Sequence, residues 1–294
     1  MEHTMIICLS IKIYKTHIIS IFIILTMLFE KYSSGPLRES EGIQSNSDER
    51  SSKEFDIVIP VGPNDIGFIS TLIEYTKKNV IGFRNIYLVS YDDTLMVDGC
   101  ITISETIYPF SKEDICAIMG PECRKNWYLQ QLLKLYSVFV IPDVLDNVLI
   151  IDSDTFFLKP TQFFANDMGL YFYMNEHHKP YFEHMSRLHP CLERILENKS
   201  GICHHMMLQK PYLVELFELV KNYHGVEFWK AFLQCVVEYN TSGASEYEIY
   251  FNFMQKMHPD KIQLRELCHR DIQRFEEIHS DRYDYVSYHW HGRY

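Results

Sequence analysis

Residues 147–154 read Asn147-Val-Leu-Ile-Ile-Asp152-Ser-Asp154. A continuous apolar run is typical of a buried parallel strand, and the two aspartates follow it at once. In an extended chain, side chains at positions i and i+2 point to the same side, so Asp152 and Asp154 should lie close together. Because open α/β sheets bind ligands at the carboxyl edge of their strands, this stretch predicts a ligand site there. The alternative is that the carboxylates only cap the following turn.

Two carboxylates held in this way suit a hard divalent cation such as Mn²⁺ or Mg²⁺, which prefers oxygen ligands. The formal net charge of −11 argues against a broad nucleic-acid surface and means that an anionic ligand would need a local cation. The segment Tyr288-His-Trp-His-Gly292 lies near the end of the chain. A neutral imidazole from His289 or His291 can complete such a metal site, unless the segment is a surface cluster.

Strands and helices alternate on both sides of the aspartate pair, which predicts an α/β fold with a mostly parallel central sheet flanked by helices. Strands are predicted at residues 55–61, 85–90, 100–104 and 147–152, and helices at residues 66–78 and 124–139. The pattern then loosens, with strands at 170–173 and 202–208 and helices at 180–197, 211–222, 226–238 and 245–257. We therefore expect one domain over 55–294, with a nucleotide-binding half at 55–160 and a helical, acceptor-side cap at 161–294.

The N-terminal region carries a different pattern. Residues 18–29 are uncharged and apolar, and 31–54 are rich in Ser, Glu and Arg. Residues 1–30 are predicted to be a type II signal-anchor, with the N-terminus in the cytosol and the rest of the chain in the secretory lumen, or a cleavable signal peptide that would leave the protein secreted or soluble. A disordered apolar tail is the third alternative. The Ser-rich stretch is predicted to be a flexible stem. The eight cysteines include no C-x-x-C pair, which argues against a zinc ribbon.

Candidate donor-binding residues follow the first strand and lie on the strongest predicted helix. Pro60, Val61 and Gly62 occupy the loop where a nucleotide base and ribose often bind, although an ordinary turn explains them too. Gln131 and Lys134 are three residues apart on one helix face and could reach a donor diphosphate, but a solvated lysine is the simpler reading. Ser153, between the two aspartates, joins this donor group.

Candidate acceptor-side residues come from the second half. Gly201 would allow the backbone to approach a sugar closely, and His204 or His205 could donate to sugar hydroxyls, unless these are core or surface imidazoles. Ser245 is a predicted helix N-cap with Glu248 at the capping-box position. Glu246 is not explained by the cap, and it could accept a proton from an acceptor hydroxyl.

Five segments together carry a resemblance to known proteins: Asp56-Ile-Val-Ile-Pro60, Trp127-Tyr-Leu-Gln-Gln-Leu-Leu-Lys134, Val148-Leu-Ile-Ile-Asp-Ser-Asp-Thr155, Ser200-Gly-Ile-Cys-His-His-Met206 and Ser245-Glu-Tyr-Glu-Ile-Tyr250. The chain resembles a poorly characterised family of GT-A-like glycosyltransferases from about residue 55 onward. The resemblance implies a Rossmann-like GT-A fold. It also implies metal-dependent sugar transfer from a nucleoside diphosphate sugar to a hydroxyl of a glycan, protein or lipid.

The chain is more distantly similar to the glycogenin-like family, glycosyltransferase family eight. That family has D-x-D after an apolar strand and a late His-aromatic-x-Gly segment, which His289-Trp-His-Gly292 matches. The resemblance implies that the metal ligands are Asp152, Asp154 and His289. No Lys-Pro-Trp follows Gly292 here, so the family's donor-phosphate lysine is not carried over.

Two other functions remain open from the residues alone. A phosphohydrolase of the haloacid-dehalogenase type also places an aspartate pair after an apolar strand, but it requires D-x-D-x-[TV], and Phe156 occupies the fifth position. A non-catalytic, membrane-anchored sugar-binding protein would fit the many tyrosines and the apolar N-terminus. Such a protein has no need of two carboxylates at a strand end.

Overall fold

The computed structural model describes residues 55–289. The predicted signal segment at 1–30, the stem at 31–54 and His291 lie outside these residues. Residues 51–294 group as one compact unit. Among the described residues, no helix has both the length and the apolar character needed to cross a membrane.

The centre of the fold is a five-stranded sheet with the strand order β10-β5-β1-β3-β4. Its strands are β1 (Phe55–Val61), β3 (Phe83–Ser90), β4 (Ile101–Ser104), β5 (Asn147–Ile151) and β10 (His205–Gln209). Strands β1, β3, β4 and β5 run parallel to one another. Strand β10 runs antiparallel to β5, with His205 opposite Ile151. The predicted α/β fold with a mostly parallel central sheet is therefore confirmed.

Three smaller sheets surround the central one. They contain β6 (Thr155–Phe157), β12 (His269–Asp271) and β13 (Tyr285–Ser287); β8 (Phe164–Ala165), β9 (Met168–Phe172) and β11 (Ile262–Arg265); and β2 (Val80–Ile81) with β7 (Thr161–Gln162). Strand β13 pairs with both β6 and β12, so Thr155, Ser287 and Asp271 lie in one row across the first of these sheets. Through this row, Asp271 and Ser287 lie beside Thr155, which follows shortly after the end of β5.

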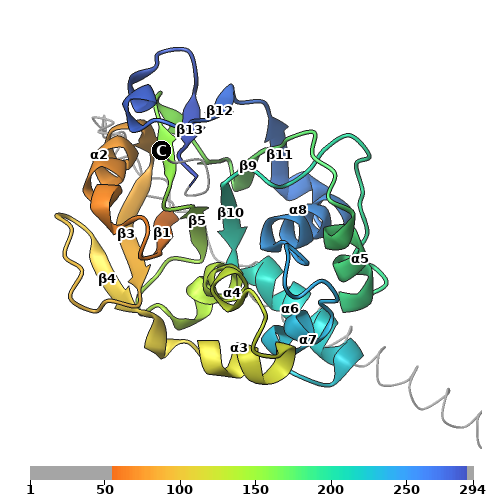
Figure 1. The fold of residues 1–294 in the computed structure, drawn as a ribbon. Coiled ribbons are helices and arrows are strands. Elements are labelled where there is room, and N and C mark those ends of the chain that lie inside the picture. The colour runs from red at the N-terminus through yellow and green to blue at the C-terminus, as the bar shows by residue number, and fades with distance from the viewer. Residues whose placement is uncertain (1–54, 290–294) are drawn as a thin grey trace, which may run out of the picture. The chain divides into compact units, whose positions relative to one another are not determined.

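Helices pack on the sheet, and several of them lie beside its β10 edge (Figure 1). They are α2 (Ile69–Asn79), α3 (Lys112–Met119), α4 (Lys125–Val140), α5 (Lys179–Leu188), α6 (Lys210–His224), α7 (Phe228–Gln234) and α8 (Glu246–Met257), with short 3₁₀ turns η1 (Ile66–Phe68), η2 (Glu105–Ile107), η3 (Pro259–Lys261) and η4 (Phe275–His279). Helix α4 packs on β1 and β5, and α8 packs on α4 and β10. This packing aligns α4, β5 and α8 beside the aspartate pair.

Several predicted boundaries differ from the structure. Helix α5 ends at Leu188 instead of 197, because the residue before Pro190 is driven out of the helical region, and His189 is extended. Helix α7 is shorter than the predicted 226–238, and the β-branched Val236 and Val237 that follow it are poor helix formers. The functional division at residue 160 within the one predicted domain stays a prediction; the central sheet itself takes β10 from the second half.

Candidate functional site

The side chain of Asp152 lies directly after β5 and is held from two helices. Lys134 Nζ of α4 lies 2.6 Å from Asp152 Oδ1, and the Tyr247 hydroxyl of α8 donates to the same oxygen at 2.8 Å. Lys134 Nζ also donates to Glu246 Oε1 at 2.6 Å, so one ammonium is shared by two carboxylates. The first aspartate of the pair is thus part of a buried ion-pair network between α4, β5 and α8.

The protonation states of this network follow from burial and charge together. Burial alone would raise the pKa of Asp152, but the Lys134 ammonium and the His204 imidazole outweigh burial and lower it. Burial would lower the pKa of Lys134, yet the two carboxylates raise it. For Glu246, burial is the larger influence and raises the pKa, against the opposing effect of Lys134. Asp152 and Lys134 are therefore charged at neutral pH.

Asp154, the second aspartate, is paired with the late histidine that the sequence singled out. His289 Nδ1 and Asp154 Oδ2 are 3.0 Å apart, although 135 residues separate them in the chain. The backbone N–H of Tyr288 donates to the carbonyl oxygen of Asp154 at 2.8 Å, which continues the pairing of β13 with β6. The other carboxylate oxygen, Asp154 Oδ1, is buried and has no hydrogen-bond partner among the described residues.

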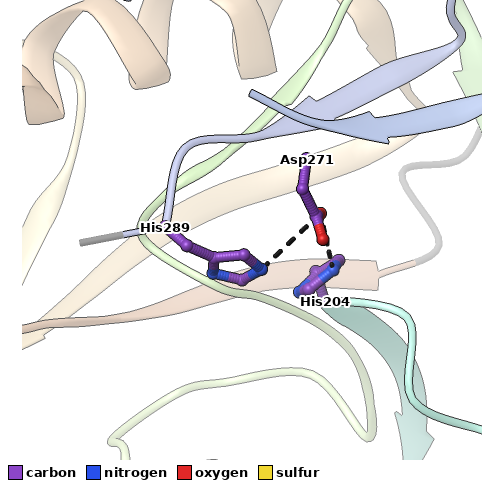
Figure 2. A group of neighbouring side chains, drawn as sticks. All are labelled: His204, Asp271 and His289. Atoms are coloured by element: carbon purple, nitrogen blue, oxygen red, sulfur yellow. Dashed lines mark ion pairs between the residues drawn. The ribbon is translucent and has the colours of Figure 1, made fainter. Parts of the chain in front are cut away.

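Two further residues stand beside His289 (Figure 2). His204 immediately precedes β10, and its carbonyl oxygen accepts from the Asp152 N–H at 2.9 Å. Asp271 ends β12 and lies between the imidazoles, with its Oδ1 3.7 Å from His204 Nε2 and 3.6 Å from His289 Nε2. Burial lowers the pKa of His289, but the hydrogen bond to Asp154 and the carboxylates of Asp154, Asp271 and Asp152 outweigh it and raise the pKa to about 9.

His205, the other histidine predicted to contact a substrate, lies in the core. Its ring stacks on Phe157 with the centroids 5.3 Å apart and lies edge-on to Phe163. Burial lowers the pKa of His205 well below its usual value, so it is neutral. His204 precedes the strand with a backbone φ of 62°, and its Nδ1 lies 3.8 Å from Asp152 Oδ2. We assign His205 to the core, not to substrate contact.

The environment of three further candidate residues, Gln131, Lys134 and Glu246, is not the one predicted. Gln131 and Lys134 do share one face of α4, but that face packs against α8 instead of opening to solvent. Gln131 Oε1 accepts from the backbone N–H of Glu246 at 3.1 Å. Glu246 is only 5% exposed, so its position favours holding Lys134 over accepting a proton from an acceptor.

Gly201 and Glu248 connect the loop before β10 to α8. A Cβ atom on Gly201 would lie 2.4 Å from Phe251 Cβ and 2.8 Å from the Tyr247 carbonyl oxygen, so the close approach is to α8 and not to a sugar. Ser245 does cap α8, accepting from the Glu248 N–H at 3.3 Å. The Glu248 carboxylate, however, accepts from Ser200 Oγ and the Gly201 N–H, and so ties the loop to the helix instead of closing a capping box.

An open cavity of about 650 Å³ lies at the carboxyl ends of β1 and β3. Pro60, Val61 and Gly62 line it, and their role in nucleotide binding stays a prediction. Ser153 Oγ donates to Asp65 Oδ2 at 2.5 Å, and this contact joins the aspartate turn to the loop that lines the cavity. The volume lies within the range of about 300–1,000 Å³ that is usual for small-molecule sites.

The cavity also has lining residues that were not among the predicted donor-binding residues. Three are basic, namely Lys112, Arg124 and Lys125, and two are aromatic, Tyr91 and Trp127. Helix α4 begins at Lys125 without a side-chain cap, so the basic residues at its start lie beside the cavity. The adjacent basic residues at the start of the predicted helix were the only signal in the sequence.

The residues around Asp154 fit a divalent cation. The buried Asp154 Oδ1 lacks a hydrogen-bond partner within residues 55–289, and buried polar atoms are paired in the great majority of cases. His204, Asp271 and His289 offer ligand atoms that all lie within 4.8 Å of one another. Imidazole and carboxylate groups in this combination are common ligands of first-row divalent metals. Asp271 could not be found from the sequence, because it follows no motif and reaches the site only through β12.

Comparisons with known proteins give structural likenesses only. No family model matches the chain, and no curated protein matches it. Mouse xyloside xylosyltransferase 1 in its apo form is similar with a TM-score of 0.44 and 10% identity, covering 82% of this chain and 99% of that one. An active-site mutant of LgtC is similar with a TM-score of 0.44 and 11% identity, covering 79% of this chain and 86% of that one. Likeness at this level does not define an activity.

Proposed function

We propose that this protein is a metal-dependent glycosyltransferase of the GT-A type, which moves a sugar from a nucleoside diphosphate sugar to a hydroxyl of a glycan, protein or lipid. One observation carries the proposal: two aspartates follow strand β5 of the central sheet, and histidines from distant segments lie beside them. The cavity at the ends of β1 and β3 supports it, since it offers basic and aromatic side chains for a nucleotide.

In this proposal the chain's own residues bind and orient the donor. The base and ribose lie against Pro60, Val61 and Gly62, and Lys112 and Arg124 attract the phosphates. The cation is held within the group of Asp152, Asp154, His204, Asp271 and His289. When bound, it supplies positive charge that stabilises the departing diphosphate.

Lys134 has a positioning role in the same proposal. It holds the Asp152 side chain through a contact in which the Lys134 side chain is 4% exposed and the Asp152 side chain is 19% exposed. Because the ammonium is held by Asp152 and Glu246 together, it is not available to a donor phosphate in this arrangement. We further propose that the N-terminal segment anchors the protein to a membrane of the secretory pathway, as its sequence predicts.

The test is a comparison of nucleotide sugars. UDP-, GDP- and CMP-sugars are added to the purified full chain with and without Mn²⁺, and unfolding temperature and nucleoside diphosphate release are measured. We expect one nucleotide class to raise the unfolding temperature only when Mn²⁺ is present, because bound ligand stabilises the folded state. The substitution His289→Gln should remove this response, and His279→Gln, an exposed histidine of η4, should keep it.

Two outcomes would contradict the proposal. Equal binding of every nucleotide without metal, or binding of none, would show that the aspartates serve no donor. Release of free phosphate from simple esters, with no release of nucleoside diphosphate, would favour a phosphohydrolase instead.

A further inference from the structure

Two cysteines lie together at the connection between α3 and α4. Cys116 is in the last turn of α3, and Cys123 lies just before α4. The backbone N–H of Gly120 donates to the Cys116 carbonyl oxygen at 2.8 Å, and the N–H of Cys123 donates to the Gly120 carbonyl oxygen at 3.4 Å. Gly120 permits this reversal with a backbone φ of 91°, which other residues rarely adopt. The chain therefore turns back toward Cys116 as soon as the helix ends.

The side chains of these two cysteines meet. Burial raises the pKa of Cys123, and a hydrogen bond between its thiol and that of Cys116 raises the pKa further. Cys123 is 8% exposed, whereas Cys116 is half-buried. The other buried cysteines are engaged differently: Cys203 Sγ donates to backbone carbonyl oxygens, and Cys235 Sγ lies 3.7 Å from His224 Nε2. Cys116 and Cys123 are therefore placed to form a bond with each other.

We propose that Cys116 and Cys123 are the site of a disulfide bond, which forms in an oxidising compartment. The N-terminal sequence predicts such a compartment, the lumen of the secretory pathway, where disulfides form and persist. The proposal does not depend on glycosyl transfer, because it rests on the contact between two thiols.

The bond forms by exchange with an oxidant of the disulfide class, such as oxidised glutathione. Cys116, the more exposed of the pair, loses its proton, and its thiolate attacks one sulfur of the oxidant. One glutathione thiolate leaves and takes up a proton. The thiolate of Cys123 then attacks the Cys116 sulfur of the mixed disulfide, and the second glutathione leaves in the same way. The two protein thiols are oxidised, and their two electrons reduce the oxidant to two glutathione thiols.

The disulfide ties together two elements that line the open cavity. Lys112, the first residue of α3, lines the cavity, as do Cys123 and the basic residues Arg124 and Lys125 that follow it. Arg124 is also held by the loop before α8, since its Nη1 donates to Ser242 Oγ at 2.8 Å. With the disulfide, this segment is held by α3 as well as by that loop. The bond therefore restrains the part of the cavity wall that carries the basic side chains.

Peptide mapping of the unaltered full chain tests the pairing directly. The chain is equilibrated with reduced and oxidised glutathione, unfolded, and alkylated with iodoacetamide before digestion. Trypsin leaves both cysteines in one peptide, residues 113–124, and cleavage after Glu122 then separates them. We expect this peptide to escape alkylation, to be lighter by two hydrogen atoms, and to stay joined after the second cleavage. The exposed Cys191 and Cys268 should be found as alkylated thiols or as mixed disulfides with glutathione.

Thermal unfolding and hydrogen exchange give a second measurement. The oxidised chain should unfold roughly 4–8 °C above the chain reduced with dithiothreitol, because the link lowers the entropy of the unfolded state. Cys116→Ser should not respond to the reductant, and Cys268→Ser, the matched control, should respond as the unaltered chain does. The substitution is made at Cys116 because Cys123 lines the cavity. Amide exchange over residues 116–124 should be several-fold slower in the oxidised chain, which measures the restraint on the wall.

Alkylation of both thiols of peptide 113–124 in the oxidising buffer would overturn the proposal, and so would a bond from either one to a different cysteine. A reductant that destabilises Cys116→Ser as much as the unaltered chain would also overturn it, and equal amide exchange would remove the restraint on the cavity. Mapping needs no variant, so it decides even if Cys116→Ser fails to fold. None of these measurements involves a nucleotide or a cation, so their failure leaves the proposed function standing. A chain that forms the disulfide but binds no nucleotide would contradict the proposed function alone.

Discussion

Lys134 compensates the charges of the two carboxylates around it. It is 3% exposed and balances two carboxylates from different elements, β5 and α8. Removing one member of a buried ion pair leaves the other charge without compensation, which costs far more than the pair contributes when intact. The residue therefore stabilises the site mainly by preventing a buried, unpaired charge.

We expect Lys134→Met to lower the free energy of unfolding by roughly 3–5 kcal/mol at neutral pH, because Asp152 and Glu246 lose their shared cation. Urea unfolding measures the change, and Lys78→Met, on the exposed face of α2, is the control with little effect. The double substitution with Glu246→Met should recover part of the loss, since one uncompensated carboxylate is removed. Equal stability of the Lys134 and Lys78 variants would contradict the network.

His204 is the second residue whose local conformation matters. Its positive φ places it in a region that non-glycine residues seldom occupy. Its carbonyl oxygen receives the Asp152 N–H, and its ring lies beside His289 with the centroids 4.7 Å apart. The turn before β10 thus holds one imidazole against both the strand end and the late part of the chain.

At the scale of elements, the site lies where the ends of several strands come together. Asp152 and Asp154 lie in the turn between β5 and β6, and Asp271 is the last residue of β12. The parallel pairing of β12 with β13 and the antiparallel pairing of β13 with β6 put these ends at one edge. A shift of one residue in either register would turn Asp271 or the Asp154 turn away from the imidazoles, because side chains alternate along a strand.

Helices α5 and α7 carry a pH-sensitive contact away from the site. His184 of α5 is fully buried, and its Nε2 lies 2.9 Å from the Phe232 carbonyl oxygen of α7. Burial, together with Arg187, lowers the pKa of His184 to about 4, against the opposing effect of that hydrogen bond. The unfolded chain, with a histidine pKa near 6.5, therefore binds the proton first as the pH falls.

It follows that the stability contributed by neutral His184 is complete above about pH 6.5 and is lost as the pH falls toward 4. At pH 5 the loss should be about 2 kcal/mol relative to pH 7. His184→Gln should reduce the slope of unfolding free energy against pH over this interval, with His279→Gln as the control. The slope should not vanish, because the buried His205 contributes in the same direction. An unchanged slope would show that His184 is not the group that titrates.

At the scale of the whole molecule, one hydrophobic core joins both halves of the folded chain. It runs from Phe55 at the start of β1 to Val286 in β13, and includes buried side chains of the central sheet and of every long helix. We expect a single core of this kind to unfold as one cooperative unit. The nucleotide half and the acceptor half are therefore consecutive parts of the chain, and we do not expect them to unfold separately.

We expect a chain that begins at Ser51 to fold by itself, because residues 51–294 form one compact unit. Scanning calorimetry should show one transition, with a midpoint within about 2 °C of that of the full chain. Two transitions, or loss of the folded state, would mean that the first 50 residues contribute to the core.

Some features of the site were accessible from the sequence. The apolar run before Asp152 predicted β5 and its carboxyl edge, because a run without polar residues can only be buried. The resemblance singled out His289, which does lie against Asp154. Of the two adjacent histidines, the sequence could not choose His204 over His205, because the face that each presents depends on how β10 pairs with β5.

The sequence by itself determined the strands, most helices and the pair of carboxylates at a strand end, because periodicity and apolar runs are local properties of the chain. Only the tertiary structure decided which groups surround those carboxylates. Lys134 and Tyr247 both reach Asp152 because α4 packs on β5 and α8 packs on α4. Asp271 joins His204 and His289 because three strand ends meet. Such contacts join residues far apart in the chain and depend on packing and register, which no short stretch of sequence encodes.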